Sequence, residues 1–189
     1  EDIINLIEQH LNFAYSSRLP VLVVAAAYEA ARSFLKESVL PIHGHNAADL
    51  QTGSLGDLEI TLIDEEKVVT AYEMKTRRVM REDIDLALIK LANYSQKIDN
   101  FVFITTQPID PLVLDYAKTV YARTGIELGI LDCVSFLRHF LYLFYRLKIS
   151  FLDNYQNLLL QEPDSAVNQP LKVAFLANRQ AAESKIFVD

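Results

Sequence analysis

Between residues 58 and 147 the chain alternates short strand-like segments with helical ones, and this alternation restricts its possible folds more than any other feature. The strand-like segments are short and either alternate apolar with polar residues or are wholly apolar, and they cover residues 58–62, 68–75, 101–105 and 126–131. Helical patterns follow the last three of them, over residues 81–94, 110–125 and 133–147. Strands that alternate with helices form a sheet covered by helices. We therefore predict an α/β fold with a mixed central sheet flanked by helices.

Further helical patterns lie on both sides of this region. They cover residues 2–15, residues 21–40 between Pro20 and Pro41, and residues 171–184 after a polar connector at 161–170. A length of 189 residues corresponds to one domain of about 150 residues with an appendage. We predict a single domain over residues 1–189, with a core at about 21–147 and a C-terminal helical extension at about 150–189. Because the chain begins at Glu1 without Met, we expect it to be part of a longer protein.

Composition excludes several classes of protein. Apolar residues make up 51% of the chain, which is enough for a sizeable core. The net charge of −7 argues against a surface that is basic all round, but leaves room for a local basic cleft. The single cysteine, Cys133, excludes an intrachain disulfide and a cysteine zinc cluster, and we expect it to be a packed thiol. No apolar run reaches the roughly 18–20 residues of a membrane span, so we expect a cytoplasmic protein without membrane contact.

Two charged side chains share one face of the predicted strand at residues 68–75. Glu73 and Lys75 are two residues apart, so they point the same way, whereas Tyr72 and Met74 point to the opposite face. Burying either charge without a partner would be costly. The pair is therefore either a functional feature or an exposed ion pair on a sheet surface.

The preceding strand supplies possible partners for this pair. We expect a register that keeps apolar residues on one face, because a slip of one residue would invert the faces. The expected pairs are Leu58 with Met74, Ile60 with Tyr72 and Leu62 with Thr70. The same register sets Asp57 opposite Lys75 and Glu59 opposite Glu73. Two or three carboxylates and one ammonium group then meet at one patch.

Such a patch is suited to Mg²⁺. This ion takes one or two carboxylates and completes its shell with waters and substrate phosphate. A lysine beside it can hold or help to deprotonate an attacking water, while the metal stabilises charge on the phosphorus oxygens. These groups fit phosphodiester hydrolysis without a covalent nucleophile.

Two short segments resemble the signature of the PD-(D/E)xK nuclease superfamily, which includes many restriction endonucleases: Gly56-Asp57-Leu58-Glu59-Ile60 and Tyr72-Glu73-Met74-Lys75. The order of elements over about residues 21–147 also resembles the core of that fold. Within the superfamily, residues 25–140 resemble SacI-type restriction endonucleases. The resemblance implies a restriction-endonuclease-like core and the activity of a type II enzyme from a restriction-modification system.

The resemblance also implies roles for five residues: Asp57 and Glu73 as metal-binding acids, the Met74 carbonyl as a further metal ligand, Lys75 as the catalytic lysine, and Glu29 as a further catalytic acid on the preceding helix. For Glu29 a solvated helix face with neighbouring basic residues is an equally good interpretation. Gly56 stands where the signature has proline, and this departure weakens the match slightly.

A cluster of basic residues follows the signature directly. Arg77, Arg78 and Arg81 form with Lys75 the densest positive cluster in the chain, and we expect them to contact the DNA backbone. Ordinary surface charge is the alternative. The loop residues His43 and His45 could bind a metal, but without a third ligand nearby a plain polar loop is the better interpretation.

We therefore expect a Mg²⁺-dependent endodeoxyribonuclease that cuts double-stranded DNA. The alternatives are a catalytically inactive nuclease-fold module for DNA binding or assembly, and a DNA-repair nuclease with the same site. Cutting both strands of a symmetric sequence favours a homodimer. The apolar helix at residues 136–147 and the segment 171–184 are the candidate contact surfaces.

Overall fold

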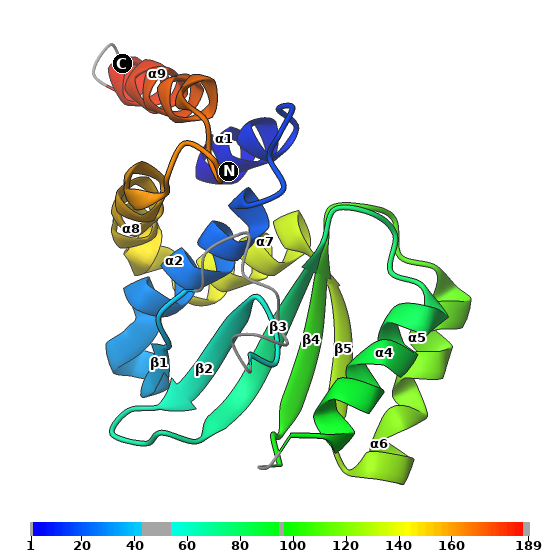
Figure 1. Cartoon of the computed structure of the whole chain (residues 1–189). Coiled ribbons are helices and arrows are strands. Elements are labelled where there is room, and N and C mark those ends of the chain that lie inside the picture. Colours follow the sequence, from blue (N-terminus) through cyan, green and yellow to red (C-terminus); the bar gives the residue numbers. More distant parts are fainter. Residues whose placement is uncertain (1, 43–53, 95–96, 187–189) are drawn as a thin grey trace.

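The computed structural model describes residues 2–42, 54–94 and 97–186, and within them five strands form one sheet in the order β1-β2-β3-β4-β5 (Figure 1). The strands are β1 (Glu37–Val39), β2 (Leu58–Leu62), β3 (Val68–Lys75), β4 (Asn100–Thr105) and β5 (Glu127–Asp132). The first three are antiparallel neighbours, and β3, β4 and β5 are parallel. The predicted mixed sheet is confirmed.

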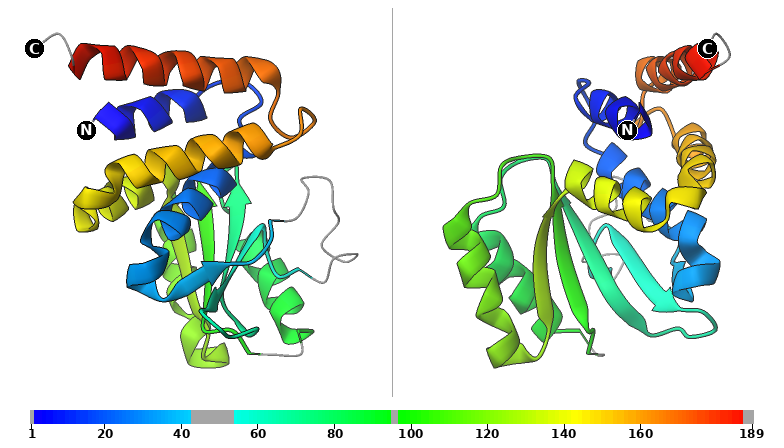
Figure 2. Two further views of the ribbon diagram at one scale, coloured as in Figure 1. Left: turned by 90° about the vertical axis from the view of Figure 1, so that its left-hand side faces the viewer. Right: turned by 180° about the vertical axis from the view of Figure 1, so that it is seen from behind.

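Helices cover both faces of this sheet (Figures 1 and 2). One face carries α4 (Arg81–Ala92), α5 (Pro111–Lys118) and α6 (Val120–Thr124). The other carries α2 (Leu19–Leu35) and α7 (Cys133–Leu143), which the short 3₁₀ helix η1 (Tyr145–Leu147) follows. Beyond these lie α8 (Lys148–Gln161), and then α1 (Asp2–Leu11) and α9 (Gln169–Ile186), which pack on each other far from the sheet (Figure 2).

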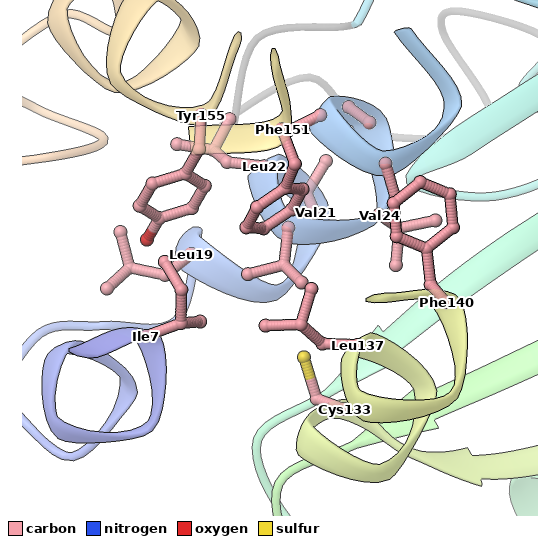
Figure 3. Packing of buried hydrophobic residues seen from close by; sticks show 14 of the residues in the cluster. Ile7, Leu19, Val21, Leu22, Val24, Cys133, Leu137, Phe140, Phe151 and Tyr155 are labelled. Carbon is pink, nitrogen blue, oxygen red and sulfur yellow. The ribbon is translucent and has the colours of Figure 1, made fainter. Parts of the chain in front are cut away.

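The hydrophobic core has two parts, one on each face of the sheet. The larger part joins α1, α2, α7 and α8, and Figure 3 shows side chains such as Ile7, Leu22, Leu137 and Phe151 meeting there. Cys133 lies in this part with no exposed surface, and burial raises the pKa of its thiol to about 12. The expectation of a packed thiol is confirmed.

Successive side chains of β3 point to opposite faces of the sheet, so they contribute alternately to the two parts of the core. Tyr72 and Met74 join the larger part, beneath α2 and α7. Ala71 joins the smaller part beneath α4, and Glu73 and Lys75 share its side of the strand. The two charged residues therefore face α4.

The first strand, β1, was not expected from the sequence, which predicted helix as far as residue 40. The helix α2 ends at Leu35 because Lys36 adopts a left-handed conformation, with φ of 59°, and its N–H bonds to the Arg32 carbonyl at 3.0 Å. The chain then turns into β1, whose Ser38 pairs with Thr61 of β2.

The register between β2 and β3 differs from the expected one by two residues. Leu58 pairs with Tyr72 instead of Met74, and Ile60 pairs with Thr70 instead of Tyr72. An irregularity between Ile60 and Thr61 shifts the register within the hairpin, which also contains Asp64 with φ of 69°. A shift of two keeps Leu58, Glu59 and Ile60 on their expected faces. Beyond the irregularity Thr61 pairs with Val68, so Thr61 is buried and Leu62, which was expected in the core, is exposed.

Cap signals located the two ends of the segment that forms α5 and α6. Asp110 caps α5 by accepting the N–H of Leu112 at 2.8 Å, and Gly125 ends α6 with φ of 68°. The single helix expected between them is divided into α5 and α6 at Thr119.

A buried histidine joins the terminal helices. His10 of α1 has no exposed surface; its Nε2 donates to the Leu171 carbonyl and its Nδ1 accepts from the Tyr155 hydroxyl, both at 2.9 Å. Burial lowers the pKa of His10 to about 4, although its bond to Leu171 opposes that shift. The imidazole is neutral at physiological pH and links α1, α8 and α9.

Candidate active site

Gly56 brings the start of β2 into close contact with β3. A Cβ atom at this position would lie 2.4 Å from the backbone oxygen of Tyr72, which is closer than real Cβ atoms approach. A proline carries the same Cβ, so the glycine that departs from the PD-(D/E)xK signature is what this backbone requires. The tight approach places the next residue, Asp57, beside the end of β3.

Asp57 is bonded directly to the strand that carries the other candidates. Its Oδ2 accepts the backbone N–H of Met74 at 2.7 Å. The carboxylate of Glu59, which was expected opposite Glu73, instead accepts the N–H of Leu55 at 2.6 Å and lies next to Ala71 in the register. Glu59 thus stabilises the turn that leads into Asp57.

Glu73 and Lys75 form an ion pair along β3. Lys75 Nζ lies 3.0 Å from Glu73 Oε1, and their side chains are 21% and 20% exposed. A second ammonium group, Lys90 Nζ from α4, lies 3.9 Å from Glu73 Oε2 and also donates to the Leu55 carbonyl at 3.0 Å. Desolvation raises the pKa of Glu73, the charge of Asp57 raises it further, and the two lysines oppose that shift.

Asp83, on the first turn of α4, is a buried acid at the same site. Arg77 donates to both of its carboxylate oxygens, at 2.5 and 2.8 Å, and the Met80 N–H donates to Oδ2 at 2.8 Å. Lys75 Nζ lies 3.7 Å from Oδ1. Burial acts to raise the pKa of Asp83, but these hydrogen bonds and positive charges outweigh it and lower the pKa.

These side chains line a pocket of about 200 Å³ between the sheet and α4. Its charged residues are Glu73, Lys75, Asp83 and Lys90, and its apolar wall comprises Leu86, Ala87, Phe101 and Phe103. The pocket combines two carboxylates and two ammonium groups next to Asp57, an arrangement suited to binding and polarising an anionic ester.

The chain was compared with known families and proteins. A family model described as "SacI restriction endonuclease C-terminal domain" matches residues 1–107, more than half of the chain. The chain belongs to this family. No curated protein matches it.

The SacI C-terminal-domain match extends from α1 to the end of β4. It includes every charged residue of the pocket as well as Asp57. The remaining elements, from α5 to α9, lie outside the matched residues. The family thus accounts for the strands and the helix that form the site.

The other residues expected at the site lie elsewhere or have partners. Glu29 is on α2, which covers the sheet face opposite Glu73. The residue before it, Tyr28, bonds to the Tyr72 hydroxyl on that opposite face. Arg77 is paired with Asp83, and the Arg81 guanidinium stacks over the Tyr116 ring at 4.0 Å. All three arginines, Arg78 included, are exposed. The histidines at 43 and 45 lie outside the described residues.

Sequence reasoning missed Asp83 and Lys90. Both are on the helix after the signature, and the Lys75 and Glu73 side chains meet them only because α4 folds back over β3. The sequence signal was present but faint: an acid at the third position of α4 followed by a lysine seven residues later. This spacing places both on one side of a helix.

The donor atoms of this family member fit a hard cation better than a thiophilic one. Asp57 and Glu73 supply oxygens, and the negative charge of Asp57 adds to the desolvation that raises the pKa of Glu73. Among residues 2–42, 54–94 and 97–186 no group of three or more His, Cys, Asp or Glu side chains is placed to hold a metal. Mg²⁺ needs only one or two carboxylates, since waters and phosphate complete its shell.

No helix within the described residues has the length and apolar character of a membrane span.

Proposed function

We propose that this chain is the catalytic domain of a Mg²⁺-dependent endodeoxyribonuclease that hydrolyses phosphodiester bonds in double-stranded DNA. In this proposal the enzyme is a type II restriction endonuclease. Its PD-(D/E)xK site lies on a restriction-endonuclease-like core. The observation that carries the proposal is the meeting of Asp57, Glu73 and Lys75 at the adjoining ends of β2 and β3. Membership of a restriction endonuclease family supports the same conclusion.

Each of the three residues has a distinct role in this proposal. Lys75 donates hydrogen bonds to the attacking water and to the scissile phosphate, where an ammonium group stabilises developing negative charge. Asp57 and Glu73, with the Met74 carbonyl, hold Mg²⁺. When bound, the ion supplies Lewis-acid stabilisation of the phosphorus oxygens and lowers the pKa of water.

The mutual repulsion of Asp57 and Glu73 supports a cation at this position. Burial and the neighbouring charge both disfavour the ionised form of Glu73. A divalent cation between the two acids would reverse the second effect, because it favours both carboxylates in their charged form. Metal binding and ionisation of Glu73 are therefore coupled.

DNA contact in this proposal comes from Arg77, Arg78 and Arg81, which follow β3 and are exposed. Arg77 is already oriented by Asp83, and its side chain is 61% exposed. Because the chain carries a net charge of −7, phosphate contacts must be local, and we expect binding to weaken steeply with added salt.

Incubation of the protein with plasmid DNA and Mg²⁺, with EDTA as the control, tests the proposal. Metal-dependent cleavage at fixed positions is expected. Binding of the plasmid without cleavage would overturn the proposal in favour of an inactive nuclease-fold module, and cleavage confined to damaged or branched DNA would favour a repair nuclease.

We also propose that the active form is a homodimer, since two strands of a symmetric site are most simply cut by two copies. The surface that supports this is the apolar end of α7 and the segment after it, where Tyr142, Leu143, Tyr145 and Ile149 are each about 60% exposed. Sedimentation of the protein with and without a palindromic DNA duplex tests it. A strict monomer that cuts both strands would contradict the dimer.

A further inference from the structure

We propose that Asp83 is a positioning residue for Lys75, holding its ammonium group from α4 when Glu73 binds the metal; this inference rests on the proposed function of the site. Asp83 does not touch the scissile bond in this proposal. It acts through Lys75, and nothing in the nuclease signature assigns it a role.

The geometry places Lys75 between two acids that belong to different elements. Its Nζ lies 3.0 Å from Glu73 Oε1 on its own strand and 3.7 Å from Asp83 Oδ1 on α4. Glu73 is the acid that the proposed metal requires. If Glu73 turns its oxygens to a cation, Asp83 is the carboxylate that remains within reach of Lys75.

Asp83 is well suited to be the fixed partner because its own position is determined by several contacts. Its side chain is only 4% exposed, and the Arg77 guanidinium and the Met80 N–H hold both carboxylate oxygens. The next residue, Ile84, is fully buried and anchors the first turn of α4 in the core. A fixed acid on a packed helix can orient a lysine more accurately than a side chain that must also bind metal.

Lys90 completes the arrangement from the same helix. Its Nζ lies 3.9 Å from Glu73 Oε2, on the other side of the carboxylate from Lys75. The pocket then holds two carboxylates and two ammonium groups. Without the Asp83 charge, Glu73 would be the only carboxylate of the pocket left to Lys75. Lys75 would then compete with Lys90 and the metal for that carboxylate.

The first test uses kinetics on four variants of the protein. Asp83→Asn keeps the shape and one acceptor oxygen, and we expect kcat for DNA cleavage to fall about 10- to 100-fold. Asp83 also holds Arg77, so KM is expected to rise no further than it does in Arg77→Ala, which should keep a kcat near the wild-type value. Asp83→Glu restores the charge and is expected to recover part of kcat. The matched control is Asp85→Asn on the same helix, whose carboxylate bonds to the exposed Tyr116 hydroxyl and should leave kcat at the wild-type value.

The second test reads the contact without cleavage. Protein with Mg²⁺ but without DNA, so that Glu73 is engaged by the ion, is treated with a limiting amine-reactive reagent, and modification of each lysine is measured by mass spectrometry. Asp83→Asn should increase the modification of Lys75 severalfold relative to Lys90, whereas general loosening of the fold would increase both together. A Tm close to that of Asp85→Asn would confirm that the fold is retained.

The two tests separate this inference from the proposed function. Equal Lys75 modification in wild type and Asp83→Asn, or a wild-type kcat in Asp83→Asn, would overturn the role of Asp83. Wild-type protein that does not cut DNA, but shows the expected change in Lys75 modification, would overturn the proposed function and with it the catalytic meaning of the Lys75–Asp83 contact.

Discussion

The carboxylate of Asp57 accepts the backbone N–H of Met74 at 2.7 Å, beyond the last backbone pair of β2 and β3, which joins Leu58 to Tyr72. A side-chain hydrogen bond thus continues the pairing of β2 and β3 beyond the last backbone pair. Because Met74 lies between Glu73 and Lys75, this bond fixes the first acid to the strand that carries the other two groups. A change in the approach of β2 should therefore disturb all three.

Gly56→Ala is expected to destabilise the protein and to reduce cleavage together. The new Cβ would lie 2.4 Å from the Tyr72 backbone oxygen, so the strands must separate and Asp57 must move. Overpacking of this kind costs about 1–3 kcal/mol, which urea denaturation can measure. The matched control is Gly129→Ala on β5, where the Cβ would meet only Val102 methyl groups at 3.7 and 3.8 Å. Equal effects of the two substitutions would contradict this account of Gly56.

Lys75→Ala is expected to abolish DNA cleavage while leaving DNA affinity within a fewfold of wild type. Lys75 acts in the transition state in the proposed mechanism, whereas the arginines after β3 contact the ground-state phosphates. A plasmid cleavage assay and a binding titration without divalent metal measure the two effects. Cleavage by Lys75→Ala at the wild-type rate would disprove the role given to this lysine.

Asp57→Asn is expected to stabilise the metal-free protein by up to about 1 kcal/mol and to remove its response to Mg²⁺. The amide oxygen can still accept the Met74 N–H, but the charge that raises the pKa of Glu73 is gone. Thermal unfolding with EDTA and with Mg²⁺ measures both effects. An unchanged Mg²⁺-induced rise in Tm would show that Asp57 does not bind the ion.

His10 is expected to make the terminal helices sensitive to acid. Its pKa is lowered from 6.5 to about 4, so between these pH values the unfolded chain binds more protons than the folded one. The stability that neutral His10 contributes is complete above pH 6.5 and falls by about 3 kcal/mol as the pH approaches 4. Denaturation series at several pH values measure this slope.

The control for this pH dependence is a comparison of two histidine variants. His10→Gln should flatten the slope between pH 4 and 6.5 relative to wild type. His139→Gln changes an exposed histidine on α7 and should leave the slope as it was. If both variants retain the wild-type slope, other groups control the acid response.

Local patterns predicted most of the secondary structure because they reflect local chemistry. Alternation of apolar residues located β2 and β3, and Asp110 and Gly125 located the two ends of the α5–α6 segment. The strand β1 was missed because its three residues continue an apparently helical sequence, and only the left-handed Lys36 interrupts it.

Features that depend on distant contacts were not accessible to the same reasoning. The periodicity of a strand fixes which face a residue occupies, so it identified Glu73 and Lys75 as neighbours, but it gives no information about a shift of two in the register of β2. Asp83 and Lys90 reach the site only through the packing of α4 on β3 and β4. Periodicity placed them on a helix, but not above a particular strand.

The four charged side chains of the pocket, Glu73, Lys75, Asp83 and Lys90, cancel one another. Charges that cancel within the pocket, with the Asp57 carboxylate beside it, exert little long-range pull on a polyanion, and the chain as a whole, at −7, repels one. In the proposed function, the first encounter with DNA therefore depends on short-range collision at the arginines after β3, and long-range electrostatic steering contributes little to its rate. For the proposed nuclease, association is then slow and selection occurs after contact, which suits an enzyme that leaves most of the DNA it meets uncut.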